Sequence, residues 1–408
     1  MQGYFGFIKN QWAILAFGFL AVFWGNFGQT FFVGWFSSHI QQSLHLSSSV
    51  YGTAYSIATL ACALTVIWAG GLIDRVSLTN YVIGVCIGLA GAAAILSQSV
   101  NFVSLVIGFY CLRLFGQALF PHVGSTTVAR TFDAHRGKAL SIASSGFPLG
   151  EIILPGLAAT AIIWFGWRGS YLLISALVMV LVLPLMLTLI HYSGLGHSEL
   201  LDTSKGKSGK SAKVRAALLT DFRYWLALPG LMAGPFIATG IFIHQGFVIG
   251  NKGWSPEWFA TCFVVYGSVH WLSSLVFGVL VDRFRAVRLL PFYLLPMALA
   301  LILLSLFSGQ WLALVFMSLL AISIGSSPPI TGSLWPEIYG VHNLGTVRSL
   351  NTAIMVFATA LSPALYGFCI DHQISFSWIF GLSAVYVLFA SALFLLSYTG
   401  NPQQHDIA

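Results

Sequence analysis

The chain contains very little charge. Asp, Glu, Lys and Arg together make up 7% of its 408 residues, whereas soluble proteins carry about 25%. Hydrophobic residues make up 57%, and there are 33 Phe and 13 Trp. A soluble domain of this composition could not cover its own surface with polar groups. We therefore predict an integral membrane protein.

Cysteines are also few. The chain has five, Cys62, Cys86, Cys111, Cys262 and Cys369, all within apolar runs and without CxxC or Cys/His ligand spacing. This pattern argues against disulfides and zinc, and apolar packing is the simpler interpretation. The sequence lacks a P-loop, HExxH, GxSxG or dinucleotide fingerprint. We expect no metal, no cofactor and no enzymatic activity.

Long apolar runs dominate what remains. A membrane-spanning helix needs ~20 apolar residues, and the sequence divides into twelve such stretches. Their approximate extents are 11–36, 50–73, 79–98, 101–127, 138–163, 169–192, 222–249, 256–281, 287–307, 310–334, 347–369 and 375–398. The first is too long for a signal peptide and precedes no small-residue cleavage site, so we expect no cleavable leader.

The basic residues predict the orientation of these helices. With the N-terminus inside, fifteen of the 18 Lys and Arg residues are cytoplasmic, Arg113 is within the bilayer, and Arg168 and Lys252 lie outside. Because cytoplasmic loops are enriched in Lys and Arg, both termini are predicted to be cytoplasmic. The net charge of +7 then reflects topology and not nucleic-acid binding. No glycosylation sequon occurs in an outside loop, which fits a bacterial inner membrane.

A polar stretch divides the chain into two related halves. The segment His197 to Arg215 is rich in Ser, Gly and Lys, which is typical of a flexible linker. Residues on either side match 208 positions apart without a gap: Gly70 and Gly278, Asp74 and Asp282, Arg75 and Arg283, Gly124 and Gly332, Ser125 and Ser333, Gly137 and Gly345, Ser141 and Ser349, Pro155 and Pro363. We predict six-helix domains at 1–192 and 222–408, joined by a cytoplasmic linker, 193–221.

Two matching segments form a recognisable motif. Gly70-Gly71-Leu72-Ile73-Asp74-Arg75 and Gly278-Val279-Leu280-Val281-Asp282-Arg283 resemble the G-x-L-x-D-R-x-G-R-R/K loop of the major facilitator superfamily. Ser77, Leu78 and Thr79 replace its Gly and basic residues in the first copy, and Arg285 replaces its Gly in the second. The resemblance implies two six-helix bundles related by a parallel repeat, with a substrate site near the midplane between them. It also implies transport by alternating access.

The motif carboxylates have candidate partners at nearby helix ends. The predicted gating residues are Asp74, Arg75, Arg130 and Arg136 in the first half and Asp282, Arg283, Glu337 and Arg348 in the second. Such contacts would hold the cytoplasmic side closed in one state of the cycle. The alternative is a static salt bridge that affects only topology.

Two ionisable residues lie in the middle of predicted spans. Arg113 and Glu151 are equally distant along the chain from Phe132, in the loop between their helices, so they should lie at similar depth. A charge at that depth normally faces a partner or a water-filled cavity. We predict that Arg113 binds a substrate anion and that Glu151 is its counter-ion, which takes up a proton during the cycle. A permanent structural ion pair is the alternative.

Other polar residues lie on helices that, by the family resemblance, line or flank the cavity. The substrate-binding candidates besides Arg113 are Asn26, Thr30, Tyr110, Gln117, His244, Gln245, Tyr266, His270, Ser327 and Asn351. His270 is also a candidate for proton coupling, because imidazole titrates near neutral pH. Any one of these residues could instead serve helix–helix contact.

Two segments suggest a substrate class. Gly146 to Pro155 and Glu337 to Arg348 resemble bacterial monocarboxylate-transporter-like facilitators, which implies proton-coupled symport of a small organic anion. Alternatively, Arg113-x-x-Gly116-Gln117 partly resembles a motif of drug antiporters, which implies proton-driven efflux of amphiphiles. A non-transporting receptor or scaffold is a third interpretation. We expect a monomer whose partners are a small-molecule substrate, protons and the lipid bilayer.

Overall fold

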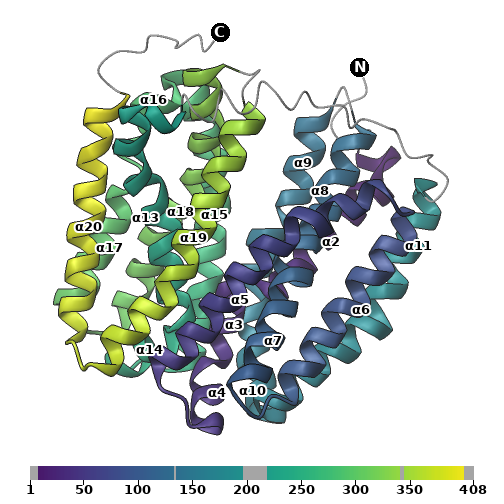
Figure 1. The fold of residues 1–408 in the computed structure, drawn as a ribbon, viewed down its shortest axis with the longest axis horizontal. Coiled ribbons are helices and arrows are strands. Elements are labelled where there is room, and N and C mark those ends of the chain that lie inside the picture. Colours follow the sequence, from purple (N-terminus) through teal and green to yellow (C-terminus); the bar gives the residue numbers. More distant parts are fainter. Residues whose placement is uncertain (1–7, 133–134, 196–217, 341–343, 399–408) are drawn as a thin grey trace. The chain divides into compact units, whose positions relative to one another are not determined.

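The structure, a computed structural model, describes residues 8–132, 135–195, 218–340 and 344–398. Over these ranges the chain is helical and has no strand, which confirms the all-α class. It divides into two compact units, Met1–Thr203 and Ser204–Ala408, which follow one another along the colour bar of Figure 1. Most of the predicted linker, 193–221, lies outside the described residues.

The apolar helices confirm a membrane protein. Among the described residues, nine helices are long and apolar enough to span a bilayer, or ten if the bent pair Trp12–Gly28 and Thr30–Leu44 is one span. One of the nine, Arg136–Ser193, has 58 residues, which at ~1.5 Å per residue exceeds the ~30 Å hydrocarbon core several-fold. Its backbone leaves the helical conformation at Gly166 (φ 66°, ψ 174°), so it contains more than one crossing. The count of twelve remains a prediction.

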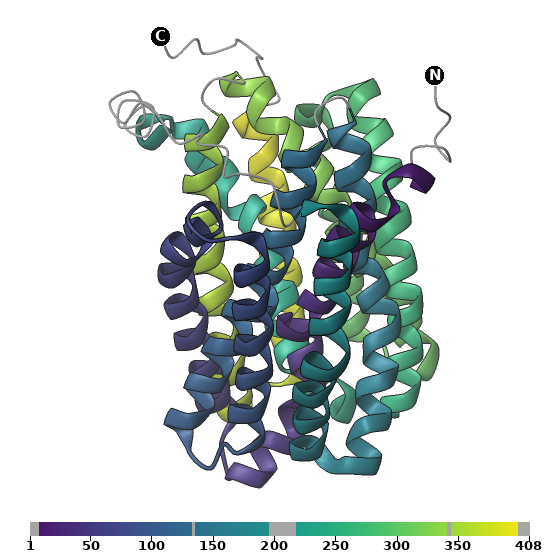
Figure 2. The same cartoon turned by 90° about the vertical axis from the view of Figure 1, so that its right-hand side faces the viewer.

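Unit 1 is built from α-helices with several short irregular segments. Its elements are α2 (Trp12–Gly25), η1 (Asn26–Gly28), α3 (Thr30–Val33), η2 (Gly34–Phe36), α4 (Ser37–Leu44), α5 (Ser48–Ala69), η3 (Gly70–Asp74), α6 (Leu78–Ser97), α7 (Phe102–Leu112), η4 (Arg113–Leu119), α8 (Phe120–Thr131), α9 (Arg136–Ser144), α10 (Gly146–Leu177), η5 (Val178–Val182) and α11 (Leu183–Ser193). Helix α2, drawn in dark purple in Figure 2, packs against α8, α9, α10 and α11. Gly25 and Asn26 at its end are buried.

Polar caps explain where several of these helices begin. The Ser47 side chain accepts a hydrogen bond from the Val50 amide at the start of α5. Asn101 and Ser104 form a reciprocal capping box at the start of α7. Ser77 caps α6 by accepting from the Asn80 amide. Because Ser is a strong N-cap residue, the departure from the family motif at Ser77 has a direct structural role.

Unit 2 contains longer, more regular helices. They are α13 (Phe222–Ile243), α14 (Gln245–Lys252), α15 (Pro256–Phe284), α16 (Ala286–Leu289), α17 (Leu295–Leu306), α18 (Gln310–Tyr339), α19 (Leu344–Asp371) and α20 (Phe376–Ser397). Helix α18 packs against α15, α16 and α17. Its Ser323 hydroxyl accepts a hydrogen bond from the Met297 amide in the first turn of α17 (2.9 Å), which supplies a partner that this helix start lacks on its own.

The two basic residues predicted to lie outside each bind the carboxyl end of another helix. Arg168 donates to the carbonyl oxygens of Ser97 (2.6 Å), the last residue of α6, and of Ser99 (2.8 Å), just after it. Lys252 donates to the carbonyl of Phe307 (2.6 Å), just after α17. Ser99 and Phe307 are 208 positions apart, the offset of the predicted repeat, and a cation binds at each of these two positions. Cations there satisfy unpaired carbonyls and favour the helix dipole.

Candidate functional site

The first apolar helix of unit 1 breaks at predicted site residues. Trp12–Gly28 and Thr30–Leu44 are bent by 44°, and Gln29 between them is extended (φ −76°, ψ 149°). The Asn26 amide donates to the carbonyl oxygens of Phe23 (3.0 Å) and Gly146 (3.1 Å), which ties the break to α10. Its Oδ1 is buried and has no hydrogen-bond partner among the described residues.

A second irregular segment lies against this break. The backbone of η4, Arg113–Leu119, is π-helical, a widened form often found at functional sites. Contact with η1 is close: a Cβ on Gly28 would overlap the Gln117 amide, and one on Gly116 would lie 2.8 Å from the Gly28 amide nitrogen. Only glycine at these two positions lets the backbones meet, so Arg113 and Gln117 are held beside the break.

Arg113 is buried in the unit and binds Tyr55. Its side chain is 6% exposed, Nη1 donates to the Tyr55 hydroxyl, and the guanidinium carbon lies 4.6 Å from the centroid of the Tyr55 ring. Its Nε is buried without an acceptor among the described residues. An unsatisfied buried donor costs about 1–3 kcal/mol. The site therefore holds a cation with unused hydrogen-bonding capacity.

Tyr55 connects Arg113 to the break. Its hydroxyl lies 2.9 Å from the Thr30 Oγ1, the first residue of α3. The structure thus brings the predicted residues Arg113 and Thr30 together through a residue that sequence analysis missed. The one available signal was the run of polar side chains on one face of α5, Tyr51, Tyr55 and Thr59. Tyr110 lies apart from this chain of contacts and is 3.0 Å from the Thr65 hydroxyl.

Glu151 lies on α10, the helix that packs against Asn26. It is buried, with 8% of its surface exposed, and follows Gly150, whose Cβ would overlap the Asn26 side chain. Asn26 therefore lies between α10, which holds Glu151, and η4, which holds Arg113. The hydrogen bond and the ring contact of the Arg113 side chain are both made to Tyr55. Direct pairing of Arg113 with Glu151 remains a prediction.

Four of the candidates in unit 2 lie at the end of α13, at the start of α14 and on α15. His244 is buried and its Nε2 donates to the Pro363 carbonyl (2.8 Å), which links the end of α13 to α19. The next residue, Gln245, is buried at the start of α14. On α15, the rings of Tyr266 and His270 are 5.9 Å apart, and Tyr266 is buried.

The last two candidates lie on other helices of unit 2. The side chain of Ser327, on α18, is partly buried. On α19, the Asn351 Oδ1 is buried without a hydrogen-bond partner among the described residues. The roles of Ser327 and Asn351 in binding stay predictions.

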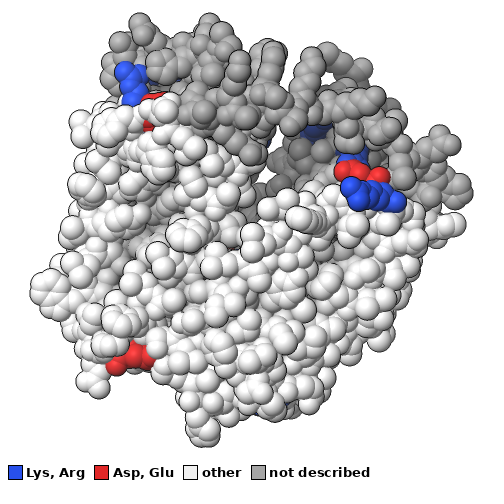
Figure 3. Space-filling model, in the orientation of Figure 1, with Lys and Arg blue, Asp and Glu red and all other residues white. Residues whose placement is uncertain are grey.

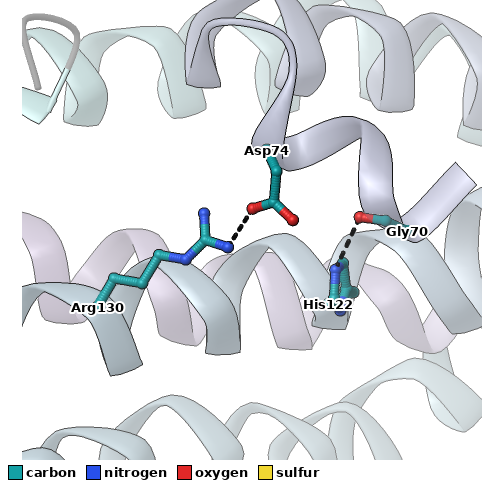
Figure 4. Close-up of polar contacts among 4 residues, drawn as sticks. All are labelled: Gly70, Asp74, His122 and Arg130. Carbon is teal, nitrogen blue, oxygen red and sulfur yellow. Dashed lines mark hydrogen bonds and ion pairs between the residues drawn. The ribbon is translucent and has the colours of Figure 1, made fainter. Parts of the chain in front are cut away.

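The first motif loop contains the predicted ion pair. Arg130 on α8 forms a salt bridge with Asp74 at the end of η3 (Figure 4). The same view shows His122, whose Nε2 donates to the Gly70 carbonyl at the start of η3 (3.2 Å). Arg136 donates through Nε to the Ala129 carbonyl (2.9 Å), and Arg75 is exposed.

The second motif loop is held differently. Glu337 on α18 accepts hydrogen bonds from the Ala286 (2.9 Å) and Val287 (3.5 Å) amides at the start of α16, and lies 3.8 Å from the Arg285 Nε. Asp282 is exposed, and no hydrogen bond or ion pair joins it to another described residue.

The remaining basic residues predicted to gate this loop contact other groups. The Arg283 guanidinium lies 5.3 Å from the Phe284 ring centroid. Arg348 donates to the Gly332 carbonyl (3.0 Å).

On the face drawn in Figure 3, coloured charged side chains occur near the two ends, and the surface between them is uncharged. This distribution fits a surface that faces lipid.

Comparison with known proteins agrees with this fold. A curated relative, an uncharacterized MFS-type transporter, YcxA, of Bacillus subtilis (strain 168), is 22% identical over 400 residues, 96% of each chain. A solved bacterial homolog of the human lysosomal transporter Spinster, inward-facing and occupied, matches with a TM-score of 0.75 at 14% identity, covering 97% of this chain and 98% of that one. Its unoccupied form matches with a TM-score of 0.70 at 15% identity, covering 95% and 97%. The Major Facilitator Superfamily model matches residues 15–267 and 237–407, and the chain therefore belongs to this superfamily of membrane transporters.

Proposed function

We propose that this transporter moves a small, monocarboxylate-like organic anion by proton-coupled symport. The observation that carries the proposal is Arg113, a buried guanidinium in a π-helical segment, whose Nε has no acceptor among the described residues. Arginine does not lose its proton in proteins, so its charge persists through the cycle. Tyr55 is neutral and accepts a hydrogen bond from Nη1 alone, so a bound anion would supply the negative charge and an acceptor for Nε.

Glu151 is the proposed proton site. It is buried on α10 and follows Gly150, which packs against Asn26. Asn26 belongs to η1, which contacts η4, the segment that contains Arg113. A buried carboxylate is sensitive to nearby charge. Movement of Arg113 toward a substrate anion would therefore change the proton affinity of Glu151. His270, which is next to Tyr266, is the second candidate.

The loop contacts support a role in alternating access. Asp74 with Arg130, and Glu337 with the start of α16, each tie a motif loop to the end of a neighbouring helix. In the proposed arrangement both motif loops and both termini are cytoplasmic, in a bacterial inner membrane, and twelve helices cross it. These contacts would form and break as the cytoplasmic side closes and opens.

Transport into proteoliposomes tests the proposal. An imposed proton gradient should drive saturable uptake, small carboxylates should compete with it, and Arg113→Ala should abolish it. Competition by lipophilic cations but not by carboxylates would instead favour efflux of amphiphiles, the reading suggested by Arg113-x-x-Gly116-Gln117. The receptor or scaffold interpretation loses its support, because the family consists of transporters.

A further inference from the structure

We infer that Tyr55 is a positioning residue that holds one end of the Arg113 guanidinium and so directs the Nε–Nη2 edge toward a carboxylate, which binds it side-on with both oxygens. The inference rests on the proposed function, in which Arg113 binds the substrate. The polar pattern of the spans does not indicate the role of Tyr55, the orientation of the Arg113 guanidinium or a preference among anions.

The edges of the guanidinium are chemically distinct. Nη1 lies on the same side as Cδ, whereas the Nε and Nη2 hydrogens point in parallel from the opposite side. This second pair matches the spacing of two carboxylate oxygens. The Tyr55 hydroxyl accepts a hydrogen bond from Nη1, while Nε is buried with no acceptor among the described residues. The unused donors thus include one arm of the side-on pair.

Tyr55 is itself rigidly held. It is fully buried, and its ring packs against Phe109 of α7 with centroids 5.5 Å apart and planes at 73°. The Arg113 guanidinium also lies over this ring, a favourable cation–π arrangement. Two contacts of different kinds, one to the hydroxyl and one to the ring, therefore restrict the rotation of the guanidinium.

The direction of the hydrogen bonds follows from Arg113. Because a guanidinium can only donate, the Tyr55 oxygen accepts from it, which leaves the phenol proton for the Thr30 Oγ1 at 2.9 Å. The Tyr55 hydroxyl is then occupied both as acceptor and as donor. A ligand is expected to bind the free edge of Arg113 and not to compete for Tyr55.

This arrangement selects for the shape of the anion. A planar carboxylate can accept both parallel N–H groups, whereas chloride offers a single centre and a neutral amide offers one oxygen without the charge. The bidentate geometry adds both energy and specificity. The site should therefore prefer carboxylates to halides and to the matching amides.

Tyr55→Phe is the decisive variant, because it keeps the ring and removes the hydroxyl. Tyr51→Phe is the matched control: Tyr51 lies one turn earlier on α5, is equally buried, and packs against the same Phe109 ring at 5.5 Å. Binding is measured on purified full-length protein with acetate, lactate, pyruvate, succinate and benzoate, and with chloride and the corresponding amides. The ¹⁵N–¹H signal of the Arg113 Nε, assigned by its loss in Arg113→Lys, is followed in parallel.

We expect a carboxylate to shift the Nε proton downfield in the wild-type protein. Tyr55→Phe should weaken that carboxylate's binding roughly 10- to 100-fold, the usual effect of losing a hydrogen bond to a charged group, and reduce its preference over chloride. Tyr51→Phe should change neither. Unchanged or tighter binding in Tyr55→Phe, or an unmoved Nε signal, overturns the positioning role.

The two proposals fail in distinguishable ways. If no carboxylate binds the wild-type protein, or if Arg113→Ala binds one with unchanged affinity, the proposed function fails and the inference fails with it. If Arg113→Ala abolishes binding but Tyr55→Phe behaves like Tyr51→Phe, only the role of Tyr55 is refuted.

Discussion

Arg130, in the last turn of α8, forms a salt bridge with Asp74 at the end of η3 (Figure 4), yet Asp282, the matching residue of the second motif, forms no such pair among the described residues. There the acidic contact comes from Glu337, which binds the start of α16. The residue 208 positions before Glu337 is Ala129, so the first half cannot make the same contact. Two loops with one motif are thus held by different residues.

We expect this asymmetry to appear in accessibility. Asp74→Asn and Glu337→Gln should each increase labelling of cysteines introduced near the ends of α5 and α15 that carry the motif loops, in a background without the five native cysteines. Asp282→Asn should have a smaller effect. The Asp74 and Arg130 side chains are 53% and 46% exposed, so loss of their pair should cost at most about 1 kcal/mol. Equal labelling in all three variants would leave these residues with a role in topology alone.

Replacement of Arg113 tests the anion site. Arg113→Ala should weaken carboxylate binding at least roughly 30-fold, the lower range for removing a buried hydrogen-bonded charge. Arg113→Lys should fail as well, because an ammonium group lacks the planar pair of donors. Isothermal titration calorimetry measures the carboxylate affinity of both variants. Near-normal binding by the lysine variant would show that charge alone is sufficient.

Glu151→Gln separates binding from coupling. The amide mimics the protonated acid, so the variant should keep substrate binding and counterflow exchange but lose uphill transport driven by a proton gradient. Counterflow exchange and uphill transport are measured in the same proteoliposomes. If Arg113 and Glu151 are instead a structural ion pair, either single variant should lose roughly 3–5 kcal/mol of stability. The Arg113→Ala/Glu151→Gln double variant should then recover folding and proton-driven transport.

Gly150→Ala tests the close contact between α10 and the break in the first helix. Its new Cβ would overlap the Asn26 side chain, whereas a Cβ on Gly156, on the same helix, meets nothing within 4 Å. Alanine favours a helix by up to about 1 kcal/mol over glycine, so Gly156→Ala should be neutral or stabilising. Gly150→Ala should lower the thermal unfolding temperature and reduce transport. Equal melting temperatures for the two variants would contradict the packing of Asn26 against α10.

The sequence alone determined the class of protein and its family. Hydropathy and scarce charge predict membrane helices from composition, and burial of Arg113 follows from its position in an apolar run. The doubled loop motif is a local pattern, which is why it identified the superfamily without a structure. Each of these properties belongs to one segment, so each can be inferred before any long-range contact is known.

Only the tertiary structure decided which side chains meet. Tyr55, 58 positions from Arg113, has no charge to set it apart from a packing aromatic, and its role depends on α5 lying beside α7 and η4. Asp74 and Asp282 are equivalent in the motif, but their surroundings differ because Glu337 reaches α16. Partners of this kind depend on how helices distant in sequence pack together, and hydropathy contains no information on that packing.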